Sequence, residues 1–489
     1  MSDLSTKLFR AEQARAMDRL AIQQYGIPGY ELMTRAGQAA FNLLLTCWPG
    51  VQTIAVFCGS GNNAGDGYVL ARLALAAGYN AEVFCVSKPA KLHGDALTAY
   101  LDYRQQGGLI NEFHPGSHLT VDVIVDALLG TGIDRPVSGR YAAAIETINN
   151  APQAGVLALD IPSGLNADTG CIMGSAILAQ QTISFIALKQ GLFTADAPGC
   201  CGTLHFDALA VPDEVYEDIS ESSLKINKPV FKLRQRCAHK GTHGHVLVIG
   251  GAPGYSGAAR LAAEAAARTG AGLVTVATHP QHAALMNACR PEIMCHGVQK
   301  AEQLAALIAK ATVLVIGPGL GQGDWGGRLY AAAISADKPM IVDADGLNLL
   351  AKKPIGRANW VLTPHPGETA RLLNISTAQV QQDRFAALRL LQEKYTGICV
   401  LKGPGTLVSD GVSVAVSTTG NPGMASGGMG DVLAGVIAAF VAQGMALMEA
   451  ACSGVYVQGE AADLAAESGE RGLLASDLMM PLRRLVNNL

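Results

Sequence analysis

The sequence is poor in aromatic and charged residues, and its cysteines lack the CxxC spacing of metal and redox motifs. Of 489 residues, 5% are aromatic and 16% are charged, whereas 49% are hydrophobic and 56 are glycine. The 11 cysteines are scattered and include no CxxC pair. This usage favours neither a disulfide framework nor a zinc site, and it fits a reducing compartment such as the cytoplasm.

Long basic runs, an export signal and a membrane span are also missing. The net charge is only -4 and no run of five basic residues occurs, so we expect small ligands rather than nucleic acid. Charges interrupt the apolar residues of the N-terminus every few positions, unlike a secretory signal. The most membrane-like run, residues 432–448, contains Gln443 and two glycines and is just below spanning length. We therefore expect a buried helix there, no membrane partner and a cytoplasmic location.

Short hydrophobic segments alternate with helix-length segments in two series, which predicts two α/β domains. A chain of this length exceeds one ordinary core, and buried runs separated by helices are typical of parallel sheets. A polar break at residues 211–236 separates the series, so we place the domains at 1–215 and 226–489. The expected strands are 53–59, 81–87, 121–130, 155–164, 181–188 and 202–209, then 245–251, 272–279, 312–321, 339–346, 359–368 and 397–410. Before them, residues 5–47 predict two helices that are split by a turn at residues 26–29.

A glycine-rich loop, SGNNAGDG at residues 60–67, lies between an expected strand and an apolar helix. Ligands bind at this end of parallel strands, and backbone N–H groups at a helix N-terminus favour phosphate. A tight turn without a ligand is the alternative reading of the loop.

The longer string SGNNAGDGY resembles the characteristic loop of the NAD(P)H-hydrate epimerase family. VDVIVDALLGTGIDRPVSG (121–139) and ALDIPSGLNADTG (158–170) are similar to further motifs of that family. The resemblance covers nearly all of residues 1–210 and implies a Rossmann-like three-layer α/β/α domain. It implies that the hydrated dinucleotide contacts Asn62, Asn63, Ala64, Gly65, Asp66, Gly130, Thr131, Gly132, Ile133, Asp134, Arg135 and Pro136, with Asp160 at the reacting ring. It also implies a potassium ion bound by Asn63, Asp126 and Ser163.

These residue types are compatible with the implied chemistry. A carboxylate such as Asp160 can transfer a proton and stabilise a transient cation during epimerisation. An amide carbonyl, a carboxylate and a hydroxyl are hard ligands that suit a hard cation, although each taken singly is also a common turn or cap residue. Lys189 is a second candidate for an acid or electrostatic role, its alternative being a solvated lysine at a strand end.

In the second half, a glycine-rich segment precedes Asp431 and an apolar helix. The backbone N–H groups of residues 427–430 can stabilise a phosphate during transfer, while Asp431 takes the proton of an acceptor hydroxyl. Alternatively, Asp431 only complements the helix dipole.

This segment resembles the GxGD-type motif of ribokinase-fold enzymes, with Gly-Gly-Met-Gly-Asp in place of the commoner Gly-Ala-Gly-Asp. Residues 239–272, IGPGLGQ (316–322), VDADGLN (342–348), TPHPGE (363–368) and LKGPGTLV (401–408) narrow the resemblance to ADP-dependent NAD(P)H-hydrate dehydratase across 239–489. It implies a ribokinase-like α/β/α domain in which Asp431 is the base and Glu368 helps to place magnesium. It also implies that the hydrate contacts Ala258, Gly319, His365 and Asp431, and that ADP contacts Lys402, Gly403, Pro404, Gly405, Thr406 and Gly430.

Some of these residues have simpler readings. His365 stands between two prolines and fits a rigid turn, and Lys402 fits an ordinary strand end. The group His239, His243 and His245 has no cysteine or carboxylate at a matching spacing, so we do not favour a metal there.

The two resemblances together predict a bifunctional enzyme that repairs hydrated NADH and NADPH. The first half would interconvert the R and S hydrates. The second would dehydrate the S form with ADP, giving NAD(P)H, AMP and phosphate. The alternative is a ribokinase-fold kinase for a small alcohol with a non-catalytic N-terminal binding module. Because enzymes built of sheets and helices often form symmetric assemblies, a homo-oligomer is expected.

Overall fold

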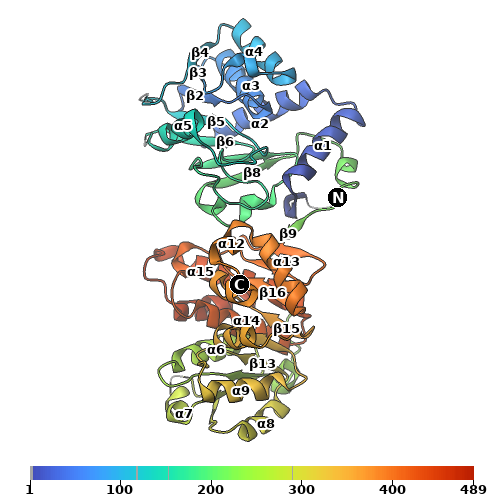
Figure 1. The fold of residues 1–489 in the computed structure, drawn as a ribbon, viewed down its shortest axis with the longest axis vertical. Coiled ribbons are helices and arrows are strands. Elements are labelled where there is room, and N and C mark those ends of the chain that lie inside the picture. Colours follow the sequence, from blue (N-terminus) through green and yellow to red (C-terminus); the bar gives the residue numbers. More distant parts are fainter. Residues whose placement is uncertain (1–3, 117–118, 152, 289, 489) are drawn as a thin grey trace. The chain divides into compact units, whose positions relative to one another are not determined.

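A computed structural model describes residues 4–116, 119–151, 153–288 and 290–488. It divides into two compact units, one ending at Leu224 and one beginning at Lys225. The first is coloured blue to green and the second yellow-green to red in Figure 1. Each unit is an α/β domain built on its own sheet.

The first unit contains a parallel sheet of seven strands in the order β4-β3-β2-β5-β6-β7-β8. Six of these strands fall on segments expected from the sequence, whereas β4 does not. The short strands β1 (Lys7–Leu8) and β9 (Ser223–Lys225) pair antiparallel outside this sheet. The sheet strands are β2 (Thr53–Cys58), β3 (Asn80–Cys85), β4 (Leu109–Glu112), β5 (Val123–Ala127), β6 (Gly155–Leu159), β7 (Gln181–Phe185) and β8 (Thr203–Asp207).

Both faces of this sheet are covered by helices, because alternate strand residues point to opposite sides. In β2, Ile54 and Val56 belong to a core shared with α1 to α4, whereas Ala55 and Phe57 pack with α5. The result is the expected three-layer arrangement, and the two helices expected within residues 5–47 are α1 and α2. The helices are α1 (Ala11–Gln23), α2 (Gly29–Cys47), α3 (Asn62–Ala76), α4 (Gly94–Gln105) and α5 (Gly139–Asn149).

The second unit has the strand order β18-β17-β16-β15-β14-β13-β10-β11-β12. The strands from β10 to β16 are parallel, and β16, β17 and β18 continue antiparallel. Neither β12 nor β18 was expected. The strands are β10 (His245–Ile249), β11 (Leu273–Thr278), β12 (Met294–Gly297), β13 (Val313–Ile316), β14 (Met340–Val342), β15 (Trp360–Leu362), β16 (Ile398–Leu401), β17 (Leu407–Ser409) and β18 (Val414–Val416).

Helices α6 and α14 pack on one face of this sheet, against Val246, Val248 and Val315. Leu247 and Leu314 are fully buried on the opposite side, where α8 and α9 contact the strands. The helices are α6 (Ser256–Thr269), α7 (Pro280–Met286), α8 (Ala301–Lys310), α9 (Asp324–Ile334), α10 (Ala344–Lys352), α11 (Pro366–Leu373), α12 (Thr377–Gln382), α13 (Arg384–Tyr395), α14 (Met429–Ala442), α15 (Leu447–Ala465) and α16 (Met479–Leu485).

The apolar run at residues 432–448 is a buried helix only in its first part. Residues 432–440 are buried in α14, but the helix ends at Ala442 and Gly444 turns the chain with a φ of 90° before α15 begins. In the described part of the chain, no helix is long and apolar enough to cross a membrane.

Candidate functional sites

The first unit contains a cavity of about 780 Å³ at the carboxyl ends of its strands. Residues from the three loops singled out in the sequence line this cavity together with Lys189, and α1 adds Asp18, which sequence reasoning missed. Ala64 and Gly65 are buried in the first turn of α3 and are not among the lining residues. The expected residues that line it are Asn62, Asn63, Asp66, Gly130, Thr131, Gly132, Ile133, Asp134, Arg135, Pro136 and Asp160.

The glycine-rich loop leads directly into helix α3. Gly61 is the N-cap residue and Asn62 begins the helix. Gly59 must lack a side chain, because a Cβ there would lie 1.9 Å from the carbonyl oxygen of Leu128. The first turn of α3 therefore opens next to the β5 loop, and its free backbone N–H groups favour an anionic ligand.

Asp126 and Ser163 form a buried network beside this loop. The carboxylate accepts hydrogen bonds from the Ser163 amide (2.7 Å) and hydroxyl (2.6 Å) and from the Leu128 amide (3.1 Å). The Asn63 side-chain amide donates to the Leu129 carbonyl over 3.1 Å, which leaves its Oδ1 buried without a hydrogen-bond partner. Burial raises the pKa of Asp126 to about 6, although its hydrogen bonds with Ser163 oppose the shift. An orphaned carbonyl oxygen beside a buried carboxyl fits a hard cation with oxygen ligands.

Asp160 and the buried Lys189 form an ion pair in the lining of the cavity. Lys189 is 2% exposed and donates to Asp160, to the Ser184 hydroxyl (3.1 Å) and to the Phe185 carbonyl (3.1 Å). Asp160 has a φ of 65°, a conformation rare for residues other than glycine that often marks functional sites. Lys189 is therefore not the solvated strand-end lysine considered as the alternative.

Two further carboxyls face the same cavity in environments that favour the protonated form. Burial, followed by the negative charge of Asp160, raises the pKa of Asp66 well above its usual range. The same two causes raise the pKa of Asp18. The cavity thus combines an ion-paired carboxylate with carboxyl groups able to hold a proton.

The second site is built on the N-terminus of α14. Gly428 is its N-cap residue with a φ of 91°, which only glycine adopts without strain. Asp431 lies in the first turn of the helix. A Cβ at Gly430 would lie 3.0 Å from Lys402 Nζ and 3.5 Å from Asp343 Oδ2, so this turn rests directly on those two side chains.

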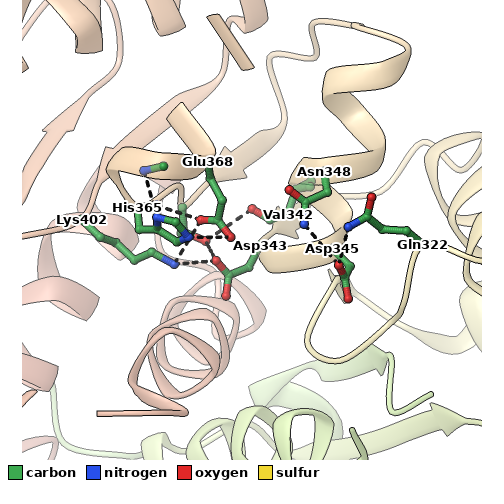
Figure 2. A network of polar contacts seen from close by, with 10 residues as sticks. Gln322, Val342, Asp343, Asp345, Asn348, His365, Glu368 and Lys402 are labelled. Atoms are coloured by element: carbon green, nitrogen blue, oxygen red, sulfur yellow. Dashed lines mark hydrogen bonds and ion pairs between the residues drawn. The ribbon is translucent and has the colours of Figure 1, made fainter. Parts of the chain in front are cut away.

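Asp343, Glu368 and Lys402 form a charged cluster beside Asp431, and Figure 2 shows their side chains pointing toward one another. Lys402 Nζ lies 2.7 Å from Asp343 Oδ1 and 3.9 Å from Glu368 Oε2. The Thr363 hydroxyl also donates to Asp343 over 2.9 Å. Asp343 is 1% and Glu368 5% exposed, so both carboxyls depend on Lys402 for compensation.

This cluster alters the protonation of its members. Burial raises the pKa of Asp431 to about 7, Asp343 and Glu368 add to the shift, and Lys402 opposes it. Burial also raises the pKa of Glu368. For Lys402, burial lowers the pKa, but attraction to Asp343 and Glu368 outweighs it and the net shift is upward. A base with a pKa near neutrality is suited to proton abstraction at physiological pH.

His365 caps helix α11 at the edge of the cluster. Its Nδ1 accepts the Gly367 amide proton at 3.0 Å, and its own amide donates to Glu368 over 2.8 Å. The ring is 51% exposed, and burial of its remainder, followed by the charge of Lys402, lowers its pKa. His365 therefore has the turn role considered from its sequence, and its exposed neutral ring is also free to meet a ligand.

Ala258 and Gly319 are neighbours, since a Cβ at Gly319 would lie 3.2 Å from that of Ala258. The adjacent loop is held by Asp345, which accepts a hydrogen bond from the Gly321 amide at 2.9 Å. It also accepts one from the Asn348 side-chain amide at 3.2 Å (Figure 2). Asp343 and Asp345 were given no role from the sequence. Both belong to VDADGLN, directly after β14, and two aspartates at the end of a buried parallel strand were the available signal.

The remaining expected residues form the loop after β16. Gly403 and Gly405 have φ values of 136° and 58°, and the Thr406 hydroxyl donates to the Gly403 carbonyl over 3.0 Å. Lys402 and Gly430 approach each other from this loop and from α14. Two of the histidines before and at the start of β10 have structural partners. His239 accepts a hydrogen bond from the Gly241 amide at 3.1 Å, and the His245 ring forms a hydrogen bond with the Thr275 hydroxyl at 2.7 Å.

Two family models match the chain, one for each half. NAD(P)H-hydrate dehydratase matches residues 246–484, and the YjeF-related protein N-terminus matches residues 29–191. A ribokinase-like superfamily protein from Enterococcus faecalis is 29% identical and has a TM-score of 0.50, with 53% of this chain and 92% of that chain covered. This likeness confirms the predicted ribokinase-like fold.

Two curated relatives match almost the entire chain. The bifunctional NAD(P)H-hydrate repair enzyme of Coxiella burnetii is 50% identical over 488 residues, covering 99% of this chain and 100% of the relative. The enzyme of the same description from Escherichia coli is 43% identical over 482 residues, covering 98% of this chain and 93% of the relative.

Proposed function

The chain belongs to the family of bifunctional NAD(P)H-hydrate repair enzymes, and we propose that it restores hydrated NADH and NADPH through one active site in each unit. The family predicted from the sequence is thereby confirmed. The assignment of each reaction to particular residues rests on the geometry of the two sites.

The cavity of the first unit supports epimerisation of the R and S hydrates. The reaction reverses the configuration of a hydroxyl-bearing carbon beside the ring nitrogen, so it needs proton transfer and stabilisation of a transient cation. Asp160 lines the cavity and is held there by its ion pair with Lys189, so its carboxylate can stabilise that cation. Asp66 lines the same cavity, and because burial raises its pKa it can donate a proton to the departing hydroxyl, which leaves as water. When water adds to the opposite face of the cation, Asp66 takes a proton from it, which restores the carboxyl and gives the other hydrate.

A potassium ion is proposed for the network beside this cavity. Asn63 would supply its unpartnered carbonyl oxygen, and Asp126 and Ser163 would supply a carboxyl and a hydroxyl oxygen. The ion would place a positive charge next to the loops that receive the anionic dinucleotide.

The cluster of the second unit supports ADP-dependent dehydration of the S hydrate. Asp431 takes the proton of the substrate hydroxyl while the hydroxyl oxygen attacks the β-phosphorus of ADP. The bond between the β-phosphorus and the oxygen that bridges the two phosphates then breaks and releases AMP. The carbon–oxygen bond of the phosphate ester then breaks, phosphate leaves, and loss of a proton from the neighbouring carbon restores NAD(P)H. Lys402 and the N–H groups before α14 stabilise the transferring phosphoryl group.

Magnesium would be held beside this site by Glu368 and Asp343 together with phosphate oxygens of the nucleotide. Magnesium commonly uses only one or two protein carboxylates, and these two buried carboxyls both lie within 4 Å of Lys402 Nζ, at 3.9 and 2.7 Å. When bound, the ion would neutralise charge on the phosphates, while Glu368 and Asp343 fix its position.

The observation that carries this proposal is the meeting of Asp431 with the Lys402, Asp343 and Glu368 cluster at one helix N-terminus. The decisive experiment incubates the protein with mixed R and S hydrates and either ADP or ATP, and follows the absorbance of reduced nicotinamide. We expect full recovery with ADP, with AMP and phosphate formed in equal amounts. Absence of recovery, or phosphorylation of a small alcohol instead, would favour the kinase alternative.

Location and assembly are also proposed. All ten cysteines in the described part of the chain carry free thiols, which supports a reducing compartment such as the cytoplasm. The expected homo-oligomer stays a prediction.

A further inference from the structure

Arg384 is buried beneath the loop of residues 402–406, and neither the sequence motifs nor the proposed mechanism uses it. It is 0% exposed, and it is the largest fully buried side chain among the residues that the structure describes. Enclosing a guanidinium in this way is costly unless its N–H groups are bonded. Its hydrogen-bond partners therefore indicate which part of the structure the buried guanidinium stabilises.

The guanidinium is bonded to the backbone at the start of this loop. Nη2 donates to the carbonyl oxygens of Leu401 (3.2 Å) and Lys402 (3.3 Å), and Nη1 donates to the same Lys402 oxygen (3.3 Å). Nη1 also donates to the Gln381 side chain over 3.2 Å. The planar group thus holds two consecutive carbonyls in fixed directions, which a lysine ammonium cannot reproduce with the same geometry.

Gly403 lies directly against this group. Its φ is 136°, and a Cβ at this position would come 2.7 Å from Arg384 Nη1. Only glycine combines this backbone conformation with so close an approach. The loop and the arginine are therefore matched to each other.

Arg384 itself is anchored at the first position of α13. The preceding residue, Asp383, caps the helix by accepting the Ala386 amide proton at 2.8 Å. Arg384 thus connects helix α13 to Lys402, whose Nζ donates a hydrogen bond to Asp343 Oδ1 over 2.7 Å.

We infer that Arg384 is a positioning residue for the nucleoside diphosphate, holding residues 402–406 in the conformation that receives the phosphates and aiming Lys402 at Asp343. It also places a permanent positive charge behind the loop, which favours an anionic ligand. This inference rests on the proposed function of the second unit.

The test compares Arg384→Gln and Arg384→Lys with the wild type in the full chain. Arg389→Gln, at an exposed position of the same helix, is the matched control. ADP binding is measured by calorimetry with magnesium, and KM for ADP, KM for the S hydrate, kcat, epimerase activity and Tm are measured alongside. We expect Arg384→Gln to weaken ADP binding about tenfold or more, with KM for the hydrate changed less than about threefold and epimerase activity unchanged. Arg384→Lys should recover part of the affinity, and the control should match the wild type.

An unchanged Kd for ADP in a folded Arg384→Gln protein would overturn the inference, as would equal weakening of ADP and hydrate binding. If Arg384→Gln does not fold, Gly403→Ala disturbs the same contact from the loop side and must show the same selective loss of ADP affinity. A wild-type protein that binds no ADP would instead overturn the proposed function on which the inference rests.

Discussion

Asp160 and Asp431 are both carboxyl groups beside the carboxyl ends of parallel strands, but their neighbours give them different chemistry. Asp160 is paired with the buried Lys189, and this ion pair fixes the carboxylate where it can stabilise a cation. Asp431 shares its surroundings with two more carboxyls, and burial and their charge raise its pKa to about 7. It is therefore suited to accept a proton at neutral pH.

Replacing Asp431 by Asn should abolish dehydration while leaving epimerisation intact. The amide cannot accept the hydroxyl proton, so kcat/KM for the S hydrate should fall about 100-fold to 10,000-fold. Recovery of reduced nicotinamide measures the loss, and chromatographic separation of the R and S forms measures epimerisation. Asp324→Asn, an exposed aspartate in the first turn of α9, should behave as wild type. Near-normal dehydration by Asp431→Asn would remove this residue from the role of base.

The dehydratase should lose activity on mild acidification. Because burial raises the pKa of Asp431 to about 7, this carboxyl keeps its proton to a higher pH than an exposed aspartate and becomes a base only as the pH rises through about 7. We therefore expect kcat/KM for the hydrate, measured at saturating ADP, to increase from about pH 6 to pH 8. A flat profile over this range would contradict the assignment.

At the scale of single residues, short motifs identified more residues of the second site than the chemistry of individual side chains did. Asp431, Lys402 and Glu368 were named from motifs, and the fold brings them together from α14, the β16 loop and α11. Asp343 and Arg384 were missed. The position of Asp343 at the end of a buried strand was a signal of a nearby ligand site. The pairing of Asp343 with a lysine 59 positions away and the bond of Arg384 to a carbonyl 18 positions away are not revealed by spacing in one sequence.

At the scale of elements, hydrophobic runs predicted the buried central strands and the edge strand β8, but they missed the edge strands β4 and β12. Strands such as β5 and β13 are entirely buried, so they appear as continuous apolar runs. Strands β4 and β12 lie at sheet edges, and β12 reads MCHG with half of its residues exposed. An edge strand buries too little surface to require an apolar sequence.

The contact between α14 and α6 depends on one glycine. A Cβ at Gly435 would lie 2.1 Å from the Ala262 carbonyl oxygen, so a methyl group must push the two helices apart. Gly435→Ala should destabilise the second unit by about 1 to 3 kcal/mol and weaken dehydration, because α14 carries Asp431, while epimerase activity is retained.

Thermal unfolding and the two activity assays check this expectation. Gly327→Ala is the control, since Gly327 lies in α9 with open space around it and alanine there should leave stability unchanged or raise it slightly. Equal stability of the two variants would mean that the helices adjust without cost.

At the scale of the whole molecule, the chain contains two units, each with its own parallel strands, core and site. The first site produces a substrate for the second, because dehydration consumes one of the two forms that epimerisation interconverts. Each unit supplies every residue proposed for its own reaction, so neither reaction requires the other site to be active.

Two full-length variants, each inactive at a different site, should therefore complement each other in solution. Asp160→Asn should dehydrate only the S form and Asp431→Asn should only epimerise, so a mixture of the two proteins should restore mixed hydrates completely, as the wild type does. The measurement is the time course of nicotinamide absorbance with ADP, corrected for spontaneous epimerisation, and the double variant provides the inactive baseline. If the mixture recovered only the S fraction while both proteins remained folded, the hydrate would have to pass between sites of one chain without release, and independent action of the two units would be wrong.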